Sequence, residues 1–403
     1  MDSLLILGGS KPYAYVSERT RALGMRAVVA DRNPKAPAAV VADAFHPVDI
    51  TDRNGILSVA MDENVSGVLA LNDFGVPTAA FVSEQLGLPG ISQDAAGVAT
   101  SKLLMRQAWQ TNNVPSADFI RVGEDDDHVR AAESIGYPVI VKPACSIGGG
   151  CRGVSLVARP EELKAAVDFA REFYPDKTIL IEEYLQGLEF SVEATVWRGR
   201  CTILAVGENV KVPAPYRVNK QIVYPAYLAP EDEHAATEAI ANAIRALPVE
   251  NGSVHVEFCL TKGGPKLIEL GARCGGGGIA GPVIMSALGI NVVDEAIRMS
   301  VGRAPILSGP LWHKTSVYHF LTPPPGTVKR ITGIEETMQL EGVEEVLLFT
   351  GPGSQVRPLR TGLERAGTVI SSHADKEEAL RIAWQADAMI NFEYETETGE
   401  VIP

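Results

Sequence analysis

Several features are missing from this sequence, and each absence excludes a class of protein. Its five cysteines form no CxxC pair, and their odd number favours reduced thiols in a cytoplasmic protein. No apolar run approaches the length of a membrane span. Positive charge is also scarce, because the formal net charge is -14 and no segment gathers lysine and arginine into a basic patch. Broad binding to nucleic acid or to acidic membranes is therefore excluded, since both partners are polyanions.

The first residues also lack the marks of a secretory signal or a dinucleotide site. Residues 1–10 carry no basic region, and the apolar run 4–7 ends at Gly8 and Gly9, which favours a buried strand. The turn that follows lacks the GxGxxG spacing with which a backbone approaches a pyrophosphate. We therefore expect a structural turn there, and a nicotinamide-dependent oxidoreductase is disfavoured.

What the chain does contain is strand–helix alternation followed by a hairpin-rich middle. In residues 1–97 short apolar runs alternate with amphipathic stretches of helical length, which predicts βαβ units around a parallel sheet. We expect an α/β chain that is α+β in its middle. The predicted domains are 1–97, then a linker helix and a compact segment in 98–190, an antiparallel region in 191–308, and a small α+β domain in 309–403.

The most informative motif is a lysine near the end of a strand, just before a glycine-rich loop. The strand reads VIVKP and contains Lys142. The small residues of the loop are Ser146, Gly148, Gly149 and Gly150. Such a loop offers backbone N–H groups to phosphate oxygens, and the lysine adds positive charge. The order differs from a P-loop, in which the lysine follows the glycines, and a plain hairpin loop is the alternative interpretation.

A second motif is a strand that ends in paired acids, Glu182 and Glu183, and turns at a glycine before Glu189. An adenine ring needs a backbone donor and acceptor at its edge, and a ribose needs an acceptor for its hydroxyl groups. The segment Tyr184-Leu185 and the Glu189 carboxylate can supply these. Solvated surface acids are the alternative.

A third motif is a hairpin that opposes two glutamates. Residues 254–259 alternate as a half-buried strand does, and a turn at residues 262–265 leads into a second strand. If the hairpin is centred on Gly263, Glu257 lies opposite Glu269, where like charges repel. Two opposed carboxylates predict a bound cation, and oxygen ligands suit Mg²⁺ or Mn²⁺. The alternative is a pair of solvated side chains.

Two further residues lie beside this hairpin. Arg273 follows the second strand and precedes four glycines, where a guanidinium can clamp an acyl phosphate or a carboxylate in bidentate fashion. The four glycines either line an acceptor pocket or form a turn. His255 is predicted on the same face as Glu257, where it either supports the metal site or is an ordinary half-buried histidine.

Together and in this order, the motifs resemble the ATP-grasp superfamily over essentially the whole chain. The resemblance includes Lys102 in a helix before the compact segment, the VIVKP strand with its loop, the EEYLQGLE turn and the E…ELGAR hairpin. Residues 209–216 and 224–225 are similar to the KxxxPPY segment of carboxylate–amine ligases, among them bacterial L-amino-acid (dipeptide) ligases. Residues 320–336 and 362–367 resemble their C-terminal domain and, more distantly, biotin carboxylase and the purine-pathway ATP-grasp enzymes.

This resemblance implies ATP and Mg²⁺ (or Mn²⁺) as cofactors and a role for each motif residue. Lys102 and Lys142 would contact ATP phosphates beneath the loop of residues 146–150. Glu182, with Glu183 beside it, and the Tyr184–Leu185 backbone would bind adenine, and Glu189 would bind the ribose. Glu257 and Glu269 would bind the metal ions. Arg273 would stabilise the acyl phosphate, and Lys211 would lie at the phosphate or acyl end of the site. Gly271 stands where many members have asparagine, so the second metal ion would have fewer protein ligands. The dipeptide ligases relax this position too.

The reaction implied is amide formation through an acyl phosphate, with ADP and phosphate released. Phosphoryl transfer relies on positioning and charge neutralisation, which suits a site of lysines and arginine without a protein nucleophile. Residues 114–185 would form a lid that keeps water from the acyl phosphate. The partners expected are a small-molecule carboxylate and an amine, and a homodimer is a reasonable expectation. A one-carbon enzyme using formate or bicarbonate and a non-catalytic nucleotide-binding module remain alternatives.

Overall fold

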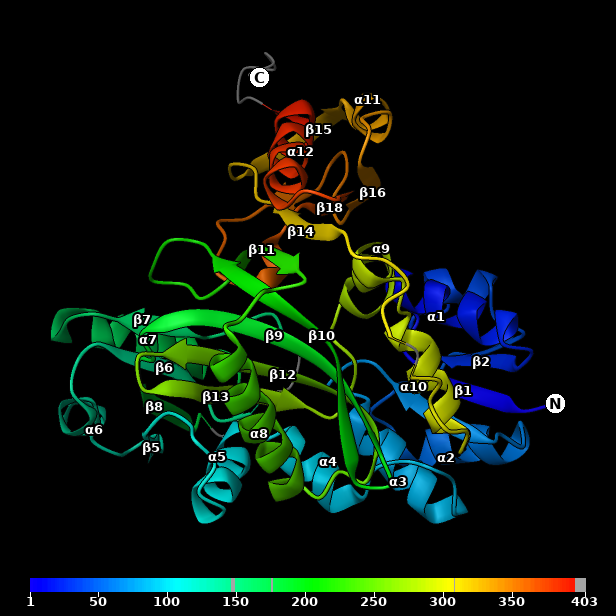
Figure 1. Cartoon of the computed structure of the whole chain (residues 1–403), viewed down its shortest axis with the longest axis horizontal. Coiled ribbons are helices and arrows are strands. Elements are labelled where there is room, and N and C mark those ends of the chain that lie inside the picture. The colour runs from blue at the N-terminus through cyan, green and yellow to red at the C-terminus, as the bar shows by residue number, and fades with distance from the viewer. Residues whose placement is uncertain (146–148, 175–176, 308, 396–403) are drawn as a thin grey trace.

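The computed structural model of the chain describes residues 1–145, 149–174, 177–307 and 309–395. Its N-terminal part is the predicted parallel sheet, with strands in the order β3-β2-β1-β4. Every residue of β1 is buried, as expected for a strand covered by helices on both faces. The elements are β1 (Ser3–Leu7), α1 (Lys11–Ala22), β2 (Arg26–Ala30), β3 (Ala44–His46), α2 (Arg53–Asp62), β4 (Gly67–Ala70) and α3 (Val76–Leu86). The strands run from the edge of the molecule toward its middle (Figure 1), so their carboxyl ends face the other regions.

The linker helix predicted to contain Lys102 is α5 (Lys102–Thr111), and a separate helix, α4 (Gln93–Ala99), precedes it. The break arises because Ser101 is extended and forms a β-bridge with Cys145, while its side chain accepts a hydrogen bond from the Leu104 N–H. Ser and Thr are favoured at such a first position, because the hydroxyl satisfies a free backbone N–H. The consequence for the site is that α5 begins at Lys102.

The segment predicted to be a lid, residues 114–185, contains its own small antiparallel sheet in the order β5-β8-β6-β7. Helices α6 and α7 cover it, and their apolar side chains form a separate core cluster with the strands. The elements are β5 (Phe119–Val122), α6 (His128–Ile135), β6 (Val139–Pro143), β7 (Ser155–Val157), α7 (Leu163–Arg171) and β8 (Ile179–Glu183).

The middle of the molecule is an antiparallel sheet of eight strands in the order β13-β12-β9-β10-β11-β14-β18-β16. Helix α8 lies along one face, where its alanines and isoleucines pack on β9, β12 and α5 (Figure 1). The elements are β9 (Gly187–Trp197), β10 (Arg200–Lys211), β11 (Asn219–Tyr224), α8 (Pro230–Ala246), β12 (Asn251–Thr261), β13 (Gly264–Gly271), α9 (Ile284–Leu288), α10 (Val292–Ser300), β14 (Thr315–Leu321), β16 (Val343–Leu348) and β18 (Gly367–His373). The antiparallel region predicted in 191–308 is confirmed, and it includes a hairpin of β9 and β10 around residues 198–199.

The boundary predicted at residues 308/309 falls between strands of this one sheet, because β14, β16 and β18 continue it. The C-terminal region adds a second, three-stranded sheet in the order β17-β15-β19. Its elements are β15 (Gly326–Thr332), α11 (Ile334–Met338), β17 (Gln355–Val356), α12 (Lys376–Met389) and β19 (Asn391–Tyr394).

The hairpin of β12 and β13 opposes Glu257 and Glu269, as predicted. The predicted centre at Gly263 is wrong, however, because the turn contains two residues, Lys262 and Gly263, and Thr261 pairs with Gly264. A bulge at Ile268 adds one residue to β13, so that the register shifts and the two glutamates still face each other.

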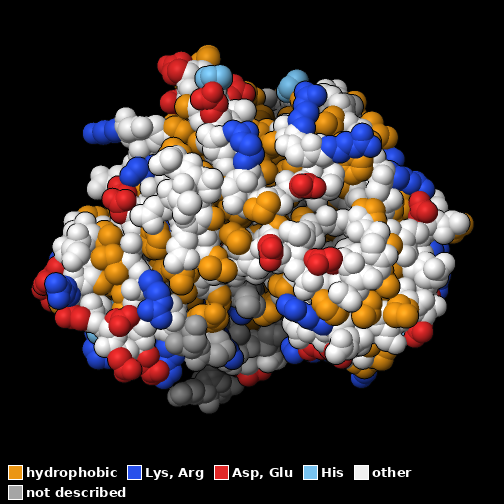
Figure 2. Space-filling model, turned by 90° about the horizontal axis from the view of Figure 1, so that it is seen from below, with side chains coloured by type: hydrophobic (Ala, Val, Ile, Leu, Met, Phe, Trp, Pro, Cys, Tyr) orange, Lys and Arg blue, Asp and Glu red, His pale blue; other side chains and the backbone are white. Residues whose placement is uncertain are grey.

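Two observations concern the surface. No helix of the described residues is long and apolar enough to cross a membrane. On the face shown in Figure 2, acidic and basic side chains are intermixed among apolar ones.

Candidate active site

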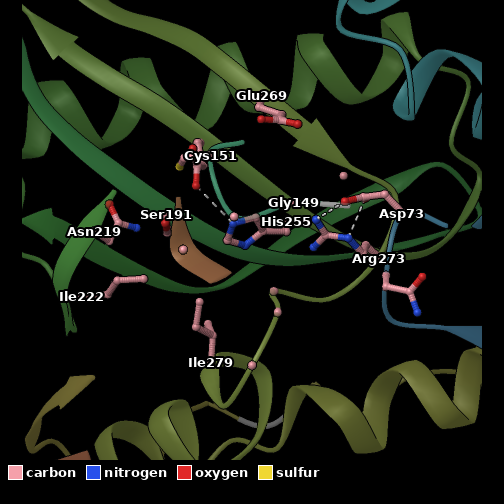
Figure 3. A pocket seen from close by; sticks show the side chains of 18 of the residues that line it. Asp73, Gly149, Cys151, Ser191, Asn219, Ile222, His255, Glu269, Arg273 and Ile279 are labelled. Carbon is pink, nitrogen blue, oxygen red and sulfur yellow. Dashed lines mark hydrogen bonds and ion pairs between the residues drawn. The ribbon is translucent and has the colours of Figure 1, made fainter. Parts of the chain in front are cut away.

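A cavity of about 910 Å³ lies where the central sheet, the lid, the N-terminal sheet and the C-terminal strands meet. The predicted site residues that line it are Lys102, Lys142, Gly149, Gly150, Glu182, Glu183, Tyr184, Leu185, Glu189, Lys211, Glu257, Glu269 and Arg273. Ser146 and Gly148 lie outside the described residues. The fold therefore brings motifs that are far apart in the sequence to one cavity, which Figure 3 shows from close by.

The two predicted metal ligands lie on the cavity face of the β12–β13 hairpin. The Lys102 ammonium lies 2.6 Å from Glu269 Oε1. Burial disfavours the charge on Lys102, but Glu269 outweighs burial and raises the pKa of the lysine. Burial likewise opposes the charge on Glu257, yet a hydrogen bond from His255 and the charge of Lys211 lower the pKa of this carboxyl.

The carboxyl groups of Glu257 and Glu269 offer oxygen ligands of the kind that Mg²⁺ takes. Within the described parts of the chain, no group of three or more His, Cys, Asp and Glu side chains is arranged to hold a metal ion. The donor set fits a cation that completes its coordination with phosphate and water oxygens rather than with further side chains.

On the cavity side of the lid's own sheet, Glu182 is buried between two cations. Lys142 Nζ lies 2.6 Å from Glu182 Oε2, and Arg106 Nη2 donates to the same oxygen at 3.1 Å. Arg106 is 1% exposed and also donates to the Ile268 carbonyl at 2.6 Å. Burial and then the neighbouring charge of Arg106 lower the pKa of Lys142 to about 8. Lys142 thus has a weakly held proton at a place where the sequence predicts phosphate.

The other predicted nucleotide ligands lie where β8 ends and β9 begins. Glu189 is held by Lys211 at 3.0 Å and by Arg217, so that its pKa is lowered although burial opposes this. Glu183 is more exposed and accepts from Lys266 at 2.8 Å. The Arg217 guanidinium lies over the Tyr184 ring, with 5.5 Å between them.

Arg273 is fixed in place by the N-terminal region. Its Nε donates to Asp73 Oδ1 at 2.7 Å, its Nη2 donates to Oδ2 at 2.9 Å, and its Nη1 donates to the Cys274 carbonyl at 2.9 Å (Figure 3). A guanidinium has five N–H groups, so these bonds leave one donor on each terminal nitrogen. Two parallel donors are the fork that binds a carboxylate or phosphate in bidentate fashion. Asp73 therefore orients the arginine and leaves its clamping edge available.

His255 joins two carboxylates on the same face of the sheet. Its Nδ1 lies 2.5 Å from Oε1 of the fully buried Glu193, and its Nε2 lies 3.7 Å from Glu257 Oε1. Burial disfavours the imidazolium, but Glu193 outweighs burial and raises the pKa of His255 to about 9. Glu193 also accepts from the Gly275 N–H at 2.9 Å. His255 is thus a charged side chain that supports the metal-site hairpin and the glycine run.

The glycine run 275–278 and the turn after β1 both line the cavity. A Cβ on Gly275 would lie 2.2 Å from Glu193 Oε1, so this position requires glycine. After β1, the Gly9 N–H donates to Asp31 Oδ2 at 2.7 Å, which fixes the turn expected to be structural. The turn therefore also forms part of the cavity wall.

The lid is in contact with the rest of the molecule. Leu156 N–H donates to the Pro215 carbonyl at 2.8 Å, and Gly362 N–H donates to the Gly150 carbonyl at 2.7 Å. At the lid's outer edge, the Arg360 guanidinium lies 4.1 Å from the centre of the Phe169 ring. These contacts join the lid to the segment between β10 and β11 and to the C-terminal region.

Sequence reasoning missed Asp73, Arg106 and Glu193. Asp73 follows a strand of the parallel sheet, and ligands of such sheets bind at carboxyl ends, which is a usable signal. Arg106 lies four residues after Lys102, on the same face of a helix. Glu193 gave no signal, because an acid in the middle of an apolar strand becomes interpretable only once its partners are known.

Three protein-family models match parts of the chain. The model of the carbamoyl-phosphate synthase large-chain ATP-binding domain matches residues 99–305, just over half of the chain. The ATP-grasp N-terminal domain matches residues 17–90, and the L-amino acid ligase C-terminal domain 2 matches residues 319–395.

Individual relatives are similar as well. An L-arginine-specific L-amino acid ligase of Bacillus subtilis is 25% identical over 320 residues, covering 76% of each chain. A D-alanine–D-alanine ligase of Haemophilus influenzae is 32% identical over 201 residues, which is 48% of this chain and 66% of that one. The crystal structure of an L-amino acid ligase from Bacillus licheniformis superposes with a TM-score of 0.85 at 23% identity, covering 98% of this chain and 99% of that one.

Proposed function

The chain belongs to the ATP-grasp enzymes, as an ATP-dependent ligase that forms C–N bonds, and we propose that it joins an amino acid or dipeptide carboxylate to an amine through an acyl phosphate. The observation that carries the proposal is the convergence in one cavity of two buried lysines, two opposed glutamates and an oriented arginine. Each of these groups suits one part of a carboxylate-activating phosphoryl transfer.

The lysines bind and neutralise the nucleotide phosphates. Lys102 stands at the start of α5 and Lys142 at the end of β6, so that they approach from two elements. Glu257 and Glu269 are the residues that would hold Mg²⁺, and a bound Mg²⁺ would neutralise charge on the phosphates. On this assignment the adenosine lies beside the end of β8 and the start of β9, where Glu189 accepts from the ribose.

Arg273 holds the carboxylate that is to be activated. One carboxylate oxygen attacks the γ-phosphorus as the bond from that phosphorus to ADP breaks, which gives an acyl phosphate. The same two N–H donors stabilise the charge that develops on the acyl group when the amine attacks the carbonyl carbon. Phosphate then leaves with the oxygen that came from the carboxylate, and the amine loses a proton to give the neutral amide.

The lid excludes water from this intermediate. Its backbone bonds to residues 215 and 362 close the cavity on two sides, which protects an acyl phosphate from hydrolysis. Gly150 forms one of these bonds, because its carbonyl accepts from the Gly362 N–H of the C-terminal region.

The test is phosphate release from Mg-ATP across a panel of single and paired amino acids, formate, bicarbonate and other small carboxylates, with products identified by mass. Release that requires both a carboxylate and an amine, with ADP and an amide as products, supports the proposal. Glu269→Gln should abolish it, and Glu341→Gln, at an exposed C-terminal position, should not. Release with formate or bicarbonate alone would contradict the proposal and favour a one-carbon enzyme, and ATP binding without release would favour a non-catalytic module.

A further inference from the structure

Arg365 is a cation of the cavity wall that faces no carboxylate. The lysines and arginines of the site described above each form an ion pair: Lys102 with Glu269, Arg106 and Lys142 with Glu182, Lys211 and Arg217 with Glu189, and Arg273 with Asp73. Arg365 also lines the cavity, but it forms no ion pair within the described ranges of the chain. Its Nη2 donates to the Asn219 carbonyl at 2.8 Å, and its buried Nε has no hydrogen-bond partner among the described residues.

The guanidinium is nevertheless held in a fixed position. It stacks on the Phe320 ring at 3.5 Å from the ring centre. The turn that precedes it is braced by a capping box, in which Thr361 and Glu364 bond to each other's backbone and side chain. A buried arginine that is oriented but unpaired costs free energy, which an anionic ligand would recover.

Asn219 adds a second polar group without a partner at the same place. It is 8% exposed and lines the cavity (Figure 3), and its buried Oδ1 accepts no hydrogen bond from any described residue. Rotation of the carboxamide exchanges this oxygen for the NH₂ group, so the side chain can donate to an anion. Because the backbone carbonyl of Asn219 accepts from Arg365, the two residues are neighbours in the cavity wall and offer donors to one ligand.

The glycine loop lies directly beside the guanidinium. A Cβ on Gly362 would lie 3.0 Å from Arg365 Nη1 and 3.2 Å from Gly150 Cα, so the arginine and the loop predicted to cover phosphates flank the same point. The Gly362 N–H also donates to the Gly150 carbonyl at 2.7 Å, which joins the turn of Arg365 to that loop.

The strand pairing places Asn219 beside the predicted nucleotide ligands. Asn219 on β11 lies directly opposite Lys211 on β10, and facing side chains of such a pair are about 4.5–5.5 Å apart at Cβ. Lys211 in turn lies 3.0 Å from Glu189, the predicted ribose ligand. Arg365 and Asn219 therefore lie between the glycine loop and the nucleotide side of the cavity, which is the place of the phosphates.

The charge of Arg365 suits the phosphoryl group that is transferred. During transfer, negative charge is spread over three oxygens of this group, which need donors from more than one direction. The ammonium groups of Lys102 and Lys142 are each partly neutralised by a glutamate, whereas the guanidinium of Arg365 is not. Its planar set of N–H donors also matches two phosphoryl oxygens at once.

We infer that Arg365, with Asn219 beside it, binds the terminal phosphoryl group of ATP and holds it during transfer to the carboxylate. This inference rests on the proposed function and assigns it a further catalytic residue, from the C-terminal region. The bond from the γ-phosphorus to the ADP oxygen breaks as the bond to the carboxylate oxygen forms. No proton moves to or from the guanidinium, which stays charged and balances the charge on the phosphoryl oxygens.

The experiment compares two nucleotides that differ in the terminal phosphoryl group. Binding of ADP and of the non-hydrolysable analogue adenylyl imidodiphosphate, each with excess Mg²⁺, is measured by calorimetry. Arg365→Met should weaken binding of the analogue on the order of 10- to 100-fold, as expected for a lost charge-assisted bond, and leave ADP binding unchanged. With the substrates that the panel above identifies, kcat should fall on the order of 100- to 1,000-fold.

Two milder variants and one control accompany this change. Arg365→Lys keeps the charge without the planar fork and should bind the analogue with intermediate affinity. Asn219→Ala should weaken binding of the analogue alone, by about 3- to 10-fold. Both variants carry the same comparison if Arg365→Met does not fold. Arg330→Met is the matched control, because this arginine pairs with Glu393 on the small C-terminal sheet, and it should leave both affinities unchanged.

Two results would overturn the inference. Equal weakening of ADP and of the analogue in Arg365→Met would indicate a merely structural role. Unchanged affinity for the analogue, with a raised KM for the carboxylate or the amine, would show that the arginine binds a substrate anion instead.

The binding assay also separates this inference from the proposed reaction, because it needs no turnover. Binding of the analogue that Arg365→Met weakens, without amide product in any assay of the panel, would keep the inference and refute the reaction. Amide synthesis whose kcat is unchanged in Arg365→Met would keep the reaction and refute the inference. A wild-type enzyme that binds neither nucleotide would refute both.

Discussion

Burial and, after it, the charge of Arg106 lower the pKa of Lys142, and replacement of Arg106 gives a prediction in two measurable quantities. The substitution Arg106→Met keeps a long apolar side chain against Trp109, over which the guanidinium lies at 5.1 Å. It removes the donors to Glu182 and to the Ile268 carbonyl. Lys142 then faces Glu182 alone, at 2.6 Å.

The first quantity is stability. The Ile268 carbonyl loses its arginine partner, which costs about 1–3 kcal/mol of stability. Glu182 keeps one of its two cations, so this second contribution to the loss of stability is smaller than for a fully broken buried ion pair. We expect a total of about 3 kcal/mol, measured as a lower midpoint of thermal unfolding. Arg130→Met, at an exposed position of α6, is the control that should leave the midpoint unchanged.

The second quantity is the pH dependence of ATP binding. The folded-state pKa of Lys142 is about 8, below the ordinary value of 10.5, so the lysine is charged below pH 8 and loses its proton as pH rises through that value. On the proposed assignment, affinity for ATP therefore falls above about pH 8, by up to tenfold per unit. Arg106→Met removes a repelling charge, so the onset of this fall should move upward by roughly one unit or more, equivalent to about 1.4 kcal/mol.

The assay is calorimetric titration with a non-hydrolysable ATP analogue across this pH range. Lys142→Arg should bind without this pH dependence, because arginine stays charged. The reasoning would be refuted by an onset that is the same in wild type and Arg106→Met, or by a wild-type affinity that does not change through pH 8.

Two further predictions follow from the loops around the cavity. Asp73→Asn removes the charge that orients Arg273. We expect kcat/KM for the carboxylate substrate to fall on the order of 10- to 100-fold while the KM of ATP stays nearly constant. Parallel losses for both substrates would contradict the positioning role. Gly187→Ala would place a Cβ 2.0 Å from the Leu260 carbonyl oxygen. This change should lower the free energy of unfolding by about 1–3 kcal/mol. An unchanged midpoint of thermal unfolding would contradict this prediction, because it would show that the backbone shifts there at little cost.

The sequence predicted the parts of the fold in which local pattern decides structure. Alternation of short apolar runs and amphipathic helices was sufficient for the parallel N-terminal sheet, and the confirmed opposition of Glu257 and Glu269 needed only the period of a strand and an approximate turn. The bulge at Ile268 could not be predicted, since a register shift depends on neighbouring strands. The prediction that Glu257 and Glu269 lie opposite each other succeeded because this bulge compensated for the misplaced turn.

The candidate site was predicted only as separate motifs, because its electrostatics arise from long-range contacts. Asp73 and Arg273 are two hundred residues apart in the chain yet form a bidentate pair. Which cation meets Glu182 likewise depends on how α5 packs beneath the lid.

The most direct test of the central claim is to follow the oxygen atoms of the carboxylate substrate. Once the panel has identified that substrate, its carboxylate is labelled with ¹⁸O, and the phosphate released during turnover with Mg-ATP and the amine is analysed by mass spectrometry. An acyl-phosphate mechanism predicts one labelled oxygen in each phosphate released, because that oxygen forms the bond to the γ-phosphorus and leaves with it. Phosphate without label, or release of AMP in place of ADP, would contradict the account.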